Sequence, residues 1–363
     1  MKYIDEFRDK NLVRSLSQKI NQIMPQQPIS LMEVCGTHTM SFQRFGLKKL
    51  LPSHLRLISG PGCPVCVSDE NYIDKAVAYS KIKDVIVVTF GDMLRVPGSY
   101  SSLEKQRAQG SDVRIVYSAW DALRIACDNP KKTVIFLSVG FETTAPTIAL
   151  SLQEARRKNL KNLLFFSSLK LIPPAMEYLL KDKRINIQGF LCPGHVSTII
   201  GVKSYEFIPK KYGIACCIAG FEPLDIMQGI YALLRQIRED RPEVINQYMR
   251  LVKRQGNKKA QALIKKVFKI TDTKWRGIGR VPKSGLKLKD EFFRFDVEKA
   301  MPLRLRQEVK DKRLKLCRCG DVLKGIIQPL ECPLFAKSCK PQSPRGPCMV
   351  SSEGTCNAYY KYR

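Results

Sequence analysis

The stretch "TVIFLSVGFETTAPTIALSLQEARRKN" (133–159) contains the three parts of an α/β unit in order. It begins with a run in which apolar side chains do not alternate with polar ones, which is typical of a parallel strand buried on both faces. The small polar cluster "GFETT" (140–144) follows directly, and apolar residues then recur at helical spacing up to residue 159. We therefore predict a strand, a loop and a helix here.

The same order recurs along the chain. Apolar runs lead into small, glycine-containing polar clusters at "ISLMEV"–"CGTHT" (29–39), "HLRLIS"–"GPGCPVC" (54–66), "DVIVVT"–"FGDM" (84–93), "IQGFLC"–"PGHVS" (187–197) and "GIACCIA"–"GFEPLD" (213–225). Ligand sites of open parallel sheets lie beyond the carboxyl ends of the strands. The polar clusters are therefore the predicted sites.

The predicted fold class is α/β, with two similar parallel-sheet lobes and a C-terminal unit of helix and loops. Residues 1–25 are expected to form a helix that packs on the C-terminal domain. The lobes are expected at 26–130 and 131–234, and a basic, cysteine-rich domain at 235–363. The repeated "GFE" at 140–142 and 220–222 is a faint indication that the lobes are related.

The net charge of +29 favours a nucleic acid, an anionic surface or an acidic protein as a partner. Residues 231–363 hold 32 of the 62 Lys and Arg but 13 of the 33 Asp and Glu. The densest piece, "RLVKRQGNKKAQALIKKVFK" (250–269), also reads as a solvated helix face, because apolar residues interrupt its charges at helical spacing. No known nucleic-acid-binding module is present.

No run of eighteen apolar residues occurs, and the N-terminus "MKYIDEFRDKNLVRSL" is charged from its second residue. We therefore expect a cytoplasmic protein that does not span a membrane. Thirteen cysteines in such a protein favour metal binding or thiol chemistry over structural disulfides.

Six of the thirteen cysteines lie in the proline-rich tail, at positions 317, 319, 332, 339, 348 and 356. The close C-x-x-C pairs of a structural zinc site are missing from this segment. An iron–sulfur cluster needs four thiolates and tolerates irregular spacing. The tail is therefore expected to hold a cluster, with a zinc site and a metal-free domain as the alternatives.

The clusters at strand ends supply the candidate chemical groups. Cys35 is either a metal ligand or a nucleophile, with His38 as a second ligand or proton carrier, and the alternative is a pair of buried packing residues. His195, Asp92 and Glu142 also follow strand-like runs. Their convergence strengthens the functional interpretation.

The pair Cys63 and Cys66 lies in the turn "GPGCPVC" (60–66), framed by glycine and proline. It is a redox dithiol, half of a zinc site or a pair of packing residues. A redox pair needs an electron source, and an iron–sulfur cluster is one. Four further cysteines, at positions 127, 192, 216 and 217, lie within or beside apolar runs and are expected to be packing residues.

Taken together, the motifs resemble those of the hydrogenase maturation factor HypD family. The resemblance rests on "MEVCGTHT" (32–39), "SGPGCPVCVS" (59–68), "FGDMLRVPGS" (90–99), "GFETTAPT" (140–147), "PGHVSTIIG" (193–201) and the cysteine-rich tail (317–362), in family order. It implies two similar α/β lobes with a cluster domain. It does not account for the strong basic charge.

The resemblance also implies a function as a scaffold with thiol redox chemistry and no classical turnover of its own. With a small HypC-type chaperone, such a protein assembles an iron ion carrying two cyanides and one carbon monoxide. A HypE-type protein donates the cyanides, and the unit passes through the HypC-type partner to the large-subunit precursor of a [NiFe]-hydrogenase.

The site residues follow from the same resemblance. Cys35 is implied as the iron ligand, and Cys63 and Cys66 as the redox dithiol. A [4Fe-4S] cluster is implied on Cys317, Cys332, Cys339 and Cys356, and Cys319 and Cys348 are then extra thiols that compete for this assignment. His38, His195, Glu142 and Asp92 are expected to surround the iron unit without binding it.

Two rival classes stay open on sequence grounds. The charge favours a nucleic-acid-binding iron–sulfur protein, whose RNA affinity would fall steeply with salt. The dithiol and cluster favour a plain oxidoreductase, which would turn over a small substrate. No membrane partner is expected, and a nucleic acid is the less favoured partner.

Overall fold

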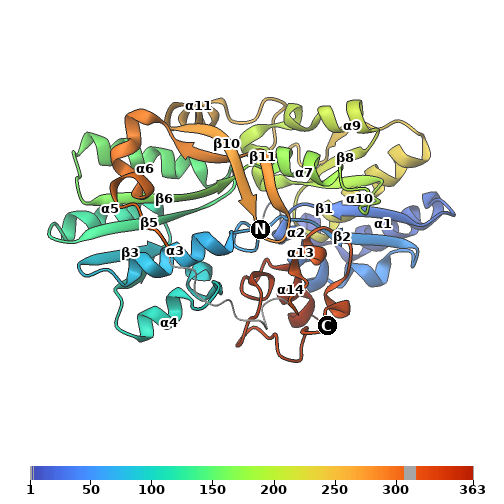
Figure 1. Cartoon of the computed structure of the whole chain (residues 1–363). Coiled ribbons are helices and arrows are strands. Elements are labelled where there is room, and N and C mark those ends of the chain that lie inside the picture. The colour runs from blue at the N-terminus through green and yellow to red at the C-terminus, as the bar shows by residue number, and fades with distance from the viewer. Residues whose placement is uncertain (1, 3, 306–315, 363) are drawn as a thin grey trace.

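The computed structural model describes residues 2, 4–305 and 316–362. Two sheets lie side by side, and the C-terminal segment packs beneath them (Figure 1). In the described part of the chain, no helix is both long and apolar enough to cross a membrane.

The first sheet is entirely parallel. Its strands are β1 (Ile29–Glu33), β2 (Leu55–Ser59), β7 (Gly189–Pro193), β8 (Ala215–Ala219) and β9 (Val244–Asn246), in the order β2-β1-β7-β8-β9. Every residue of β7 and β8 is buried, as expected for strands covered on both faces.

The second sheet has a parallel part and an antiparallel extension. β3 (Val85–Thr89), β4 (Val113–Ile115), β5 (Thr133–Gly140) and β6 (Leu163–Lys170) run parallel. The hairpin of β10 (Phe268–Trp275) and β11 (Gly279–Leu288) joins the edge at β6 and gives the order β10-β11-β6-β5-β3-β4. These two sheets confirm the predicted α/β fold.

Helices cover both sheets. The larger ones are α1 (Lys10–Ile23), α2 (Gly36–Arg44), α3 (Glu70–Ser80), α5 (Ala119–Asp128), α6 (Ala145–Arg157), α7 (Ile172–Leu179), α10 (Pro223–Arg238) and α11 (Lys258–Val267). In α6, Ala145, Ile148 and Leu152 are buried at helical spacing, as the sequence predicted. Asp9 begins α1, because its carboxylate accepts hydrogen bonds from the amides of Asn11 and Leu12.

Shorter elements complete the chain. They are η1 (Asp5–Arg8), η2 (Leu47–Leu50), η3 (Gly91–Arg95), α4 (Leu103–Ala108), α8 (Gly194–Ile200), η4 (Val202–Tyr205), α9 (Phe207–Tyr212), η5 (Asp290–Phe295), α12 (Val297–Ala300), α13 (Cys319–Leu323), η7 (Pro329–Glu331), η8 (Pro347–Met349) and α14 (Thr355–Lys361). The last four surround the tail cysteines.

Sheet membership differs from the predicted boundaries at residues 130 and 234. The segment 26–130 gives β1 and β2 to one sheet but β3 and β4 to the other, and 131–234 is divided in the same way. The segment 235–363 contributes β9, β10 and β11 to the sheets. Each lobe is therefore assembled from separate parts of the chain, because parallel strands pair wherever their crossover connections allow.

The sequence predicted that the N-terminal helix packs on the C-terminal domain, but α1 packs chiefly on the first sheet. Its buried residues Val13 and Ile20 belong to the same apolar core as Leu233 and Leu234 of α10, on the first sheet. The N-terminal helix thus stabilises the first sheet.

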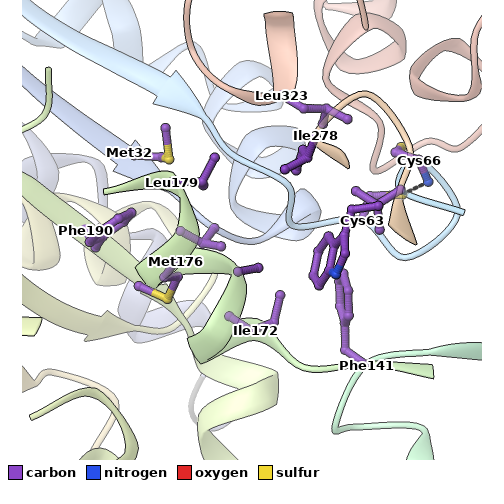
Figure 2. Packing of buried hydrophobic residues seen from close by; sticks show 14 of the residues in the cluster. Met32, Cys63, Cys66, Phe141, Ile172, Met176, Leu179, Phe190, Ile278 and Leu323 are labelled. Carbon is purple, nitrogen blue, oxygen red and sulfur yellow. Dashed lines mark hydrogen bonds between the residues drawn. The ribbon is translucent and has the colours of Figure 1, made fainter. Parts of the chain in front are cut away.

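A separate apolar core joins the sheets to the tail. It contains Phe141 after β5, Met32 of β1 and Leu323 of α13. Figure 2 shows Cys63 and Cys66 in this core, near Ile278. The core fixes the relative position of the strand ends and the tail cysteines.

Candidate functional site

A pocket of about 370 Å³ opens where the carboxyl ends of the two sheets face each other. Its walls come from the segments after β1, β2, β5 and β7 and from the tail: Val34, Cys35, Thr37, Gly62, Pro64, Phe141, Thr143, Thr144, Pro193, His195, Val196, Thr198, Ile199 and Glu353. We call it the Cys35 pocket. The sequence predicted that strand-end clusters would meet, and four of them do.

Cys35 lies at the N-terminus of α2 and is 8% exposed. Burial, and then the charge of Glu353, raises the pKa of this thiol to about 12. The amides of His38 and Thr37 at the start of α2 act in the opposite direction, because they stabilise negative charge on sulfur. Without a cation beside it, Cys35 is therefore a protonated thiol at neutral pH.

Glu353 is the pocket residue that the sequence analysis missed. Its carboxylate accepts a 2.6 Å hydrogen bond from the hydroxyl of Thr37. A Cβ on Gly36 would lie 2.5 Å from the backbone oxygen of Glu353, so glycine is required for this close approach. The tail therefore closes one wall of the pocket beside Cys35.

The two predicted histidines occupy different places. His195 is exposed and lines the pocket, where partial burial lowers its pKa and the charge of Glu353 opposes that shift. His38 is fully buried behind the wall, with Nε2 2.9 Å from the backbone oxygen of Gly220. The ring of Phe221 lies against both, with centroids 4.1 Å from His195 and 4.8 Å from His38.

His38 is held as a neutral base. Burial lowers its pKa to about 4, and Nε2 must carry the proton because it faces backbone carbonyls. Its Nδ1 is buried and has no hydrogen-bond partner among the described residues. His38 thus fixes the start of α2 to the end of β8, one layer away from the pocket.

The two predicted acidic residues do not line the pocket. Glu142 is buried, and its Oε1 accepts a 2.9 Å hydrogen bond from the amide of Ile172 at the start of α7. Burial raises the pKa of this carboxyl to about 7. Asp92 is half-buried in η3 after β3. Phe141 and Thr143, the residues on either side of Glu142, reach the pocket instead.

Cys63 and Cys66 lie in the turn after β2, adjacent to the pocket wall. The amide of Cys66 donates to Sγ of Cys63 at 3.4 Å, and Cys66 is fully buried (Figure 2). A Cβ on Gly62 would lie 2.3 Å from the amide nitrogen of Cys35, so the turn is in close backbone contact with Cys35 and has no room for a side chain at position 62. Burial raises the pKa of the Cys66 thiol well above its usual value.

The tail cysteines line a second, small cavity. All six line it, together with Leu334, Phe335, Gly346 and Met349: Cys317, Cys319, Cys332, Cys339, Cys348 and Cys356. A hydrogen bond with Cys319, and then burial, raises the pKa of the Cys317 thiol. The thiol of Cys348 contacts Cys319, Cys356 and also Cys66. The tail cavity and the turn at 63–66 therefore touch.

Comparison with known proteins assigns this arrangement to a family. The family model described as "Hydrogenase formation hypA family" (HypD) matches residues 11–363. Hydrogenase maturation factor HypD2 of Bradyrhizobium diazoefficiens is 45% identical over all of this chain and 97% of its own length. The factors named HypD from Cupriavidus necator and Escherichia coli are 44% and 42% identical, again over all of this chain and over 97% and 98% of their own lengths.

The chain belongs to the HypD family. The resemblance drawn from the motifs is therefore confirmed over the whole length. Curated HypD proteins are hydrogenase maturation factors by name.

The donor set of the tail fits a cofactor held by thiolates. Five of its six cysteines are buried and the sixth is half-buried, which suits a permanently bound group shielded from water. Among the described residues, no three His, Cys, Asp or Glu side chains already surround a single point as ligands of one metal ion would. In a four-iron cluster each thiolate binds a different iron, so the sulfurs need not converge on one point.

The remaining cysteines divide into two kinds. Cys192, Cys216 and Cys217 are buried in β7 and β8, as expected for packing residues. Cys127 is exposed at the end of α5, so the packing assignment was wrong for this residue.

The sequence signal for Glu353 was its place in "SSEGTC" (351–356), next to a candidate ligand, but only the fold brings it to Cys35.

Proposed function

We propose that the chain is a scaffold of [NiFe]-hydrogenase maturation on which an iron ion receives two cyanides and one carbon monoxide. The observation that carries this proposal is the single thiol of Cys35 on a pocket wall. This thiol is separate from the tail thiols, and the turn that holds Cys63 and Cys66 contacts the Cys35 backbone. A cargo that must leave needs few protein ligands, and a resident cofactor needs many.

Cys35 is the proposed ligand of the iron ion. Cyanide and carbon monoxide require a soft-ligated iron, which a thiolate provides. The amides at the start of α2 stabilise the thiolate once a cation displaces its proton. His195, Thr37 and Glu353 line the same pocket and supply polar groups to the diatomic ligands. His38 acts through its hold on α2, and Glu142 and Asp92 support the surrounding segments.

The tail is proposed to hold a [4Fe-4S] cluster on Cys317, Cys332, Cys339 and Cys356. The cluster would supply two electrons, one at a time, which with two protons reduce the disulfide form of Cys63 and Cys66 to the dithiol. Cys348 contacts both Cys66 and Cys356, so its thiol links the dithiol to a proposed ligand of the cluster. Cys319 contacts Cys317 and Cys348 and completes this row of sulfurs.

The partners follow from the family. A HypC-type chaperone would share the iron at Cys35, and a HypE-type protein would donate cyanide. The finished unit would then pass to the hydrogenase large-subunit precursor through the HypC-type partner. We place this work in the cytoplasm, and we expect no classical turnover reaction by the chain alone.

The test is infrared spectroscopy of the chain purified anaerobically together with its HypC-type partner. We expect bands of iron-bound cyanide and carbon monoxide in the wild type and their loss in Cys35→Ala, with the visible absorption of the tail cluster retained. Cys127→Ala is the matched control, because it removes an exposed thiol outside both sites. Undiminished bands in Cys35→Ala would remove Cys35 from the iron site.

A further inference from the structure

The loop over the tail cavity carries only positive charge. Residues 333–352 contain Lys337, Lys340 and Arg345 and no Asp or Glu. Lys337 and Lys340 are exposed, and neither forms an ion pair with a carboxylate of a described residue. Unpaired surface cations create a local field that attracts an acidic partner.

The same loop is in direct contact with the tail thiols. The backbone amide of Arg345 donates to Sγ of Cys339 at 3.3 Å. A Cβ on Gly346 would lie 2.5 Å from Sγ of Cys317, so the backbone here rests on that sulfur. Because electron transfer falls steeply with distance, this loop is a favourable entry point to a group bound by Cys339 and Cys317.

The segment between Cys317 and Cys332 is different, because it carries both signs of charge. Arg318 is paired with Asp321, and the other charged residues are Lys324 and the exposed Glu331. An acidic partner would meet carboxylates there. The charge pattern therefore selects the face formed by residues 337–345.

A pocket of about 310 Å³ lies at the edge of this face, between the loop and the segment 95–105. Its polar lining includes Arg95, Lys105 and Arg345 against one carboxylate, Glu104, together with the hydroxyl-bearing Ser101 and Ser102. The guanidinium of Arg95 donates to the backbone oxygens of Pro341 and Val350, which fastens the loop to the second sheet. The pocket is therefore preformed and suits a carboxylate side chain of a partner.

We propose that the face formed by Lys337, Lys340 and Arg345, with the pocket beside Arg95, docks a small acidic iron–sulfur protein that carries one electron. The inference rests on the proposed function, because the docked carrier supplies the electrons that reduce the disulfide of Cys63 and Cys66. Two reduced carriers, docking in turn, each give one electron. With two protons from solvent they convert the disulfide of Cys63 and Cys66 into two thiols, and two oxidised carriers leave.

A protein fits this face better than a nucleic acid. Nucleic-acid affinity grows with the number of neutralised phosphates, and proteins that bind DNA contact about 6–10 of them. The face offers three cations and the pocket two more, in a compact area. A compact cationic face over a redox centre is the surface that electrostatic steering of a small protein requires.

The experiment uses the full-length chain with its cluster and an acidic [2Fe-2S] ferredoxin as the probe. Binding is measured by calorimetry at low and high salt with both proteins oxidised, so no turnover is needed. We expect Lys337→Glu/Lys340→Glu to weaken binding at least about tenfold at low salt and to flatten its salt dependence. Carbodiimide coupling should join Lys337 or Lys340 of the wild type to carboxylates of the probe.

The matched control is Lys258→Glu/Lys259→Glu, which makes the same charge change at exposed residues of α11. Equal weakening by both double variants would show that only the net charge matters and would overturn the proposal. Failure of the wild type to bind the ferredoxin would also overturn it. So would RNA binding by the wild type that Lys337→Glu/Lys340→Glu abolishes and the control variant does not. Cluster absorption and chemical reduction of the disulfide should stay unchanged in both variants. If the wild type itself lacks these two signals, the result counts against the proposed function and not against the docking face.

Discussion

The Cys35 pocket and the tail cavity both place cysteine at a predicted site, yet they are built in opposite ways. The pocket has one thiol on a wall formed by four strand ends and by Glu353. The cavity has six thiols packed around a space of about 10 Å³. The single thiol suits a group that arrives and leaves, and the six thiols suit a group that stays.

The two sites are close in the fold although their chemistry differs. The segment "SSEGTC" (351–356) carries Glu353 into the pocket and Cys356 into the cavity. The turn at 60–66 likewise places Gly62 against Cys35 and Cys66 against Cys348. The two sites therefore differ in the number of thiols that line them, although the segment 351–356 contributes to both.

Loss of a cavity ligand should have the largest effect. We expect Cys356→Ala to abolish the visible absorption of the tail cluster after anaerobic purification, because four thiolates are needed to hold it. Cys319→Ser is the matched comparison, since it changes a thiol of the same cavity that we do not assign as a ligand. Bleaching by Cys319→Ser with retention in Cys356→Ala would reverse the ligand choice and leave the comparison of the two sites intact.

A smaller effect is expected from Thr37→Val, which removes the hydroxyl that donates to Glu353 and keeps the side-chain shape. A hydrogen bond to a charged group contributes about 1.5–3 kcal/mol, so retention of the iron unit should fall by about tenfold or more. Infrared band intensity per chain measures this, and the cluster absorption should not change. Thr271→Val, in β10 and outside both sites, is the control. Parallel loss of both signals would show that the two sites cannot be separated.

The smallest effect concerns Glu142, which supports the pocket without lining it. Its pKa is raised to about 7 from an ordinary 4.5, so the folded chain binds this proton more tightly than the unfolded chain does. The resulting stability is present below pH 4.5 and is lost as the pH rises to about 7. Glu142→Gln keeps an oxygen for the amide of Ile172 and removes the buried charge.

We therefore expect Glu142→Gln to be more stable than the wild type at pH 8.5, by about 1–3 kcal/mol, and the difference to shrink by pH 5.5. Urea unfolding midpoints at the two pH values measure it. Glu239→Gln, a half-exposed residue at the end of α10, should leave the midpoint within about 0.5 kcal/mol at both. A wild type that is the more stable of the two at pH 8.5 would contradict this account of Glu142.

Much of the fold could be predicted from local pattern. Cys35, Cys63, Glu142 and His195 were placed after buried runs, and each follows a strand of the structure. The meeting of strand ends at one pocket follows from the general geometry of parallel sheets. The sequence also separated the tail thiols from Cys35.

The partition of strands between the sheets could not be predicted in this way. The runs "ISLMEV" (29–34) and "DVIVVT" (84–89) are equally apolar, and nothing in them specifies that β1 pairs with β7 while β3 pairs with β5. The direction in which each side chain points could not be predicted from the sequence either. Glu142 and His38 are adjacent to pocket residues in sequence, but each points into the core and hydrogen-bonds to backbone instead.

The interleaved order of strands has a consequence for how the chain is made. β1 and β2 emerge from the ribosome early, but their partner β7 begins only at residue 189. At typical synthesis rates, this edge waits on the order of 10 s, with apolar surface open to chaperones. The cysteines of the tail emerge last, after every strand of both sheets. The wall at Glu353 is therefore the last part of the Cys35 pocket to leave the ribosome, after every strand of both sheets.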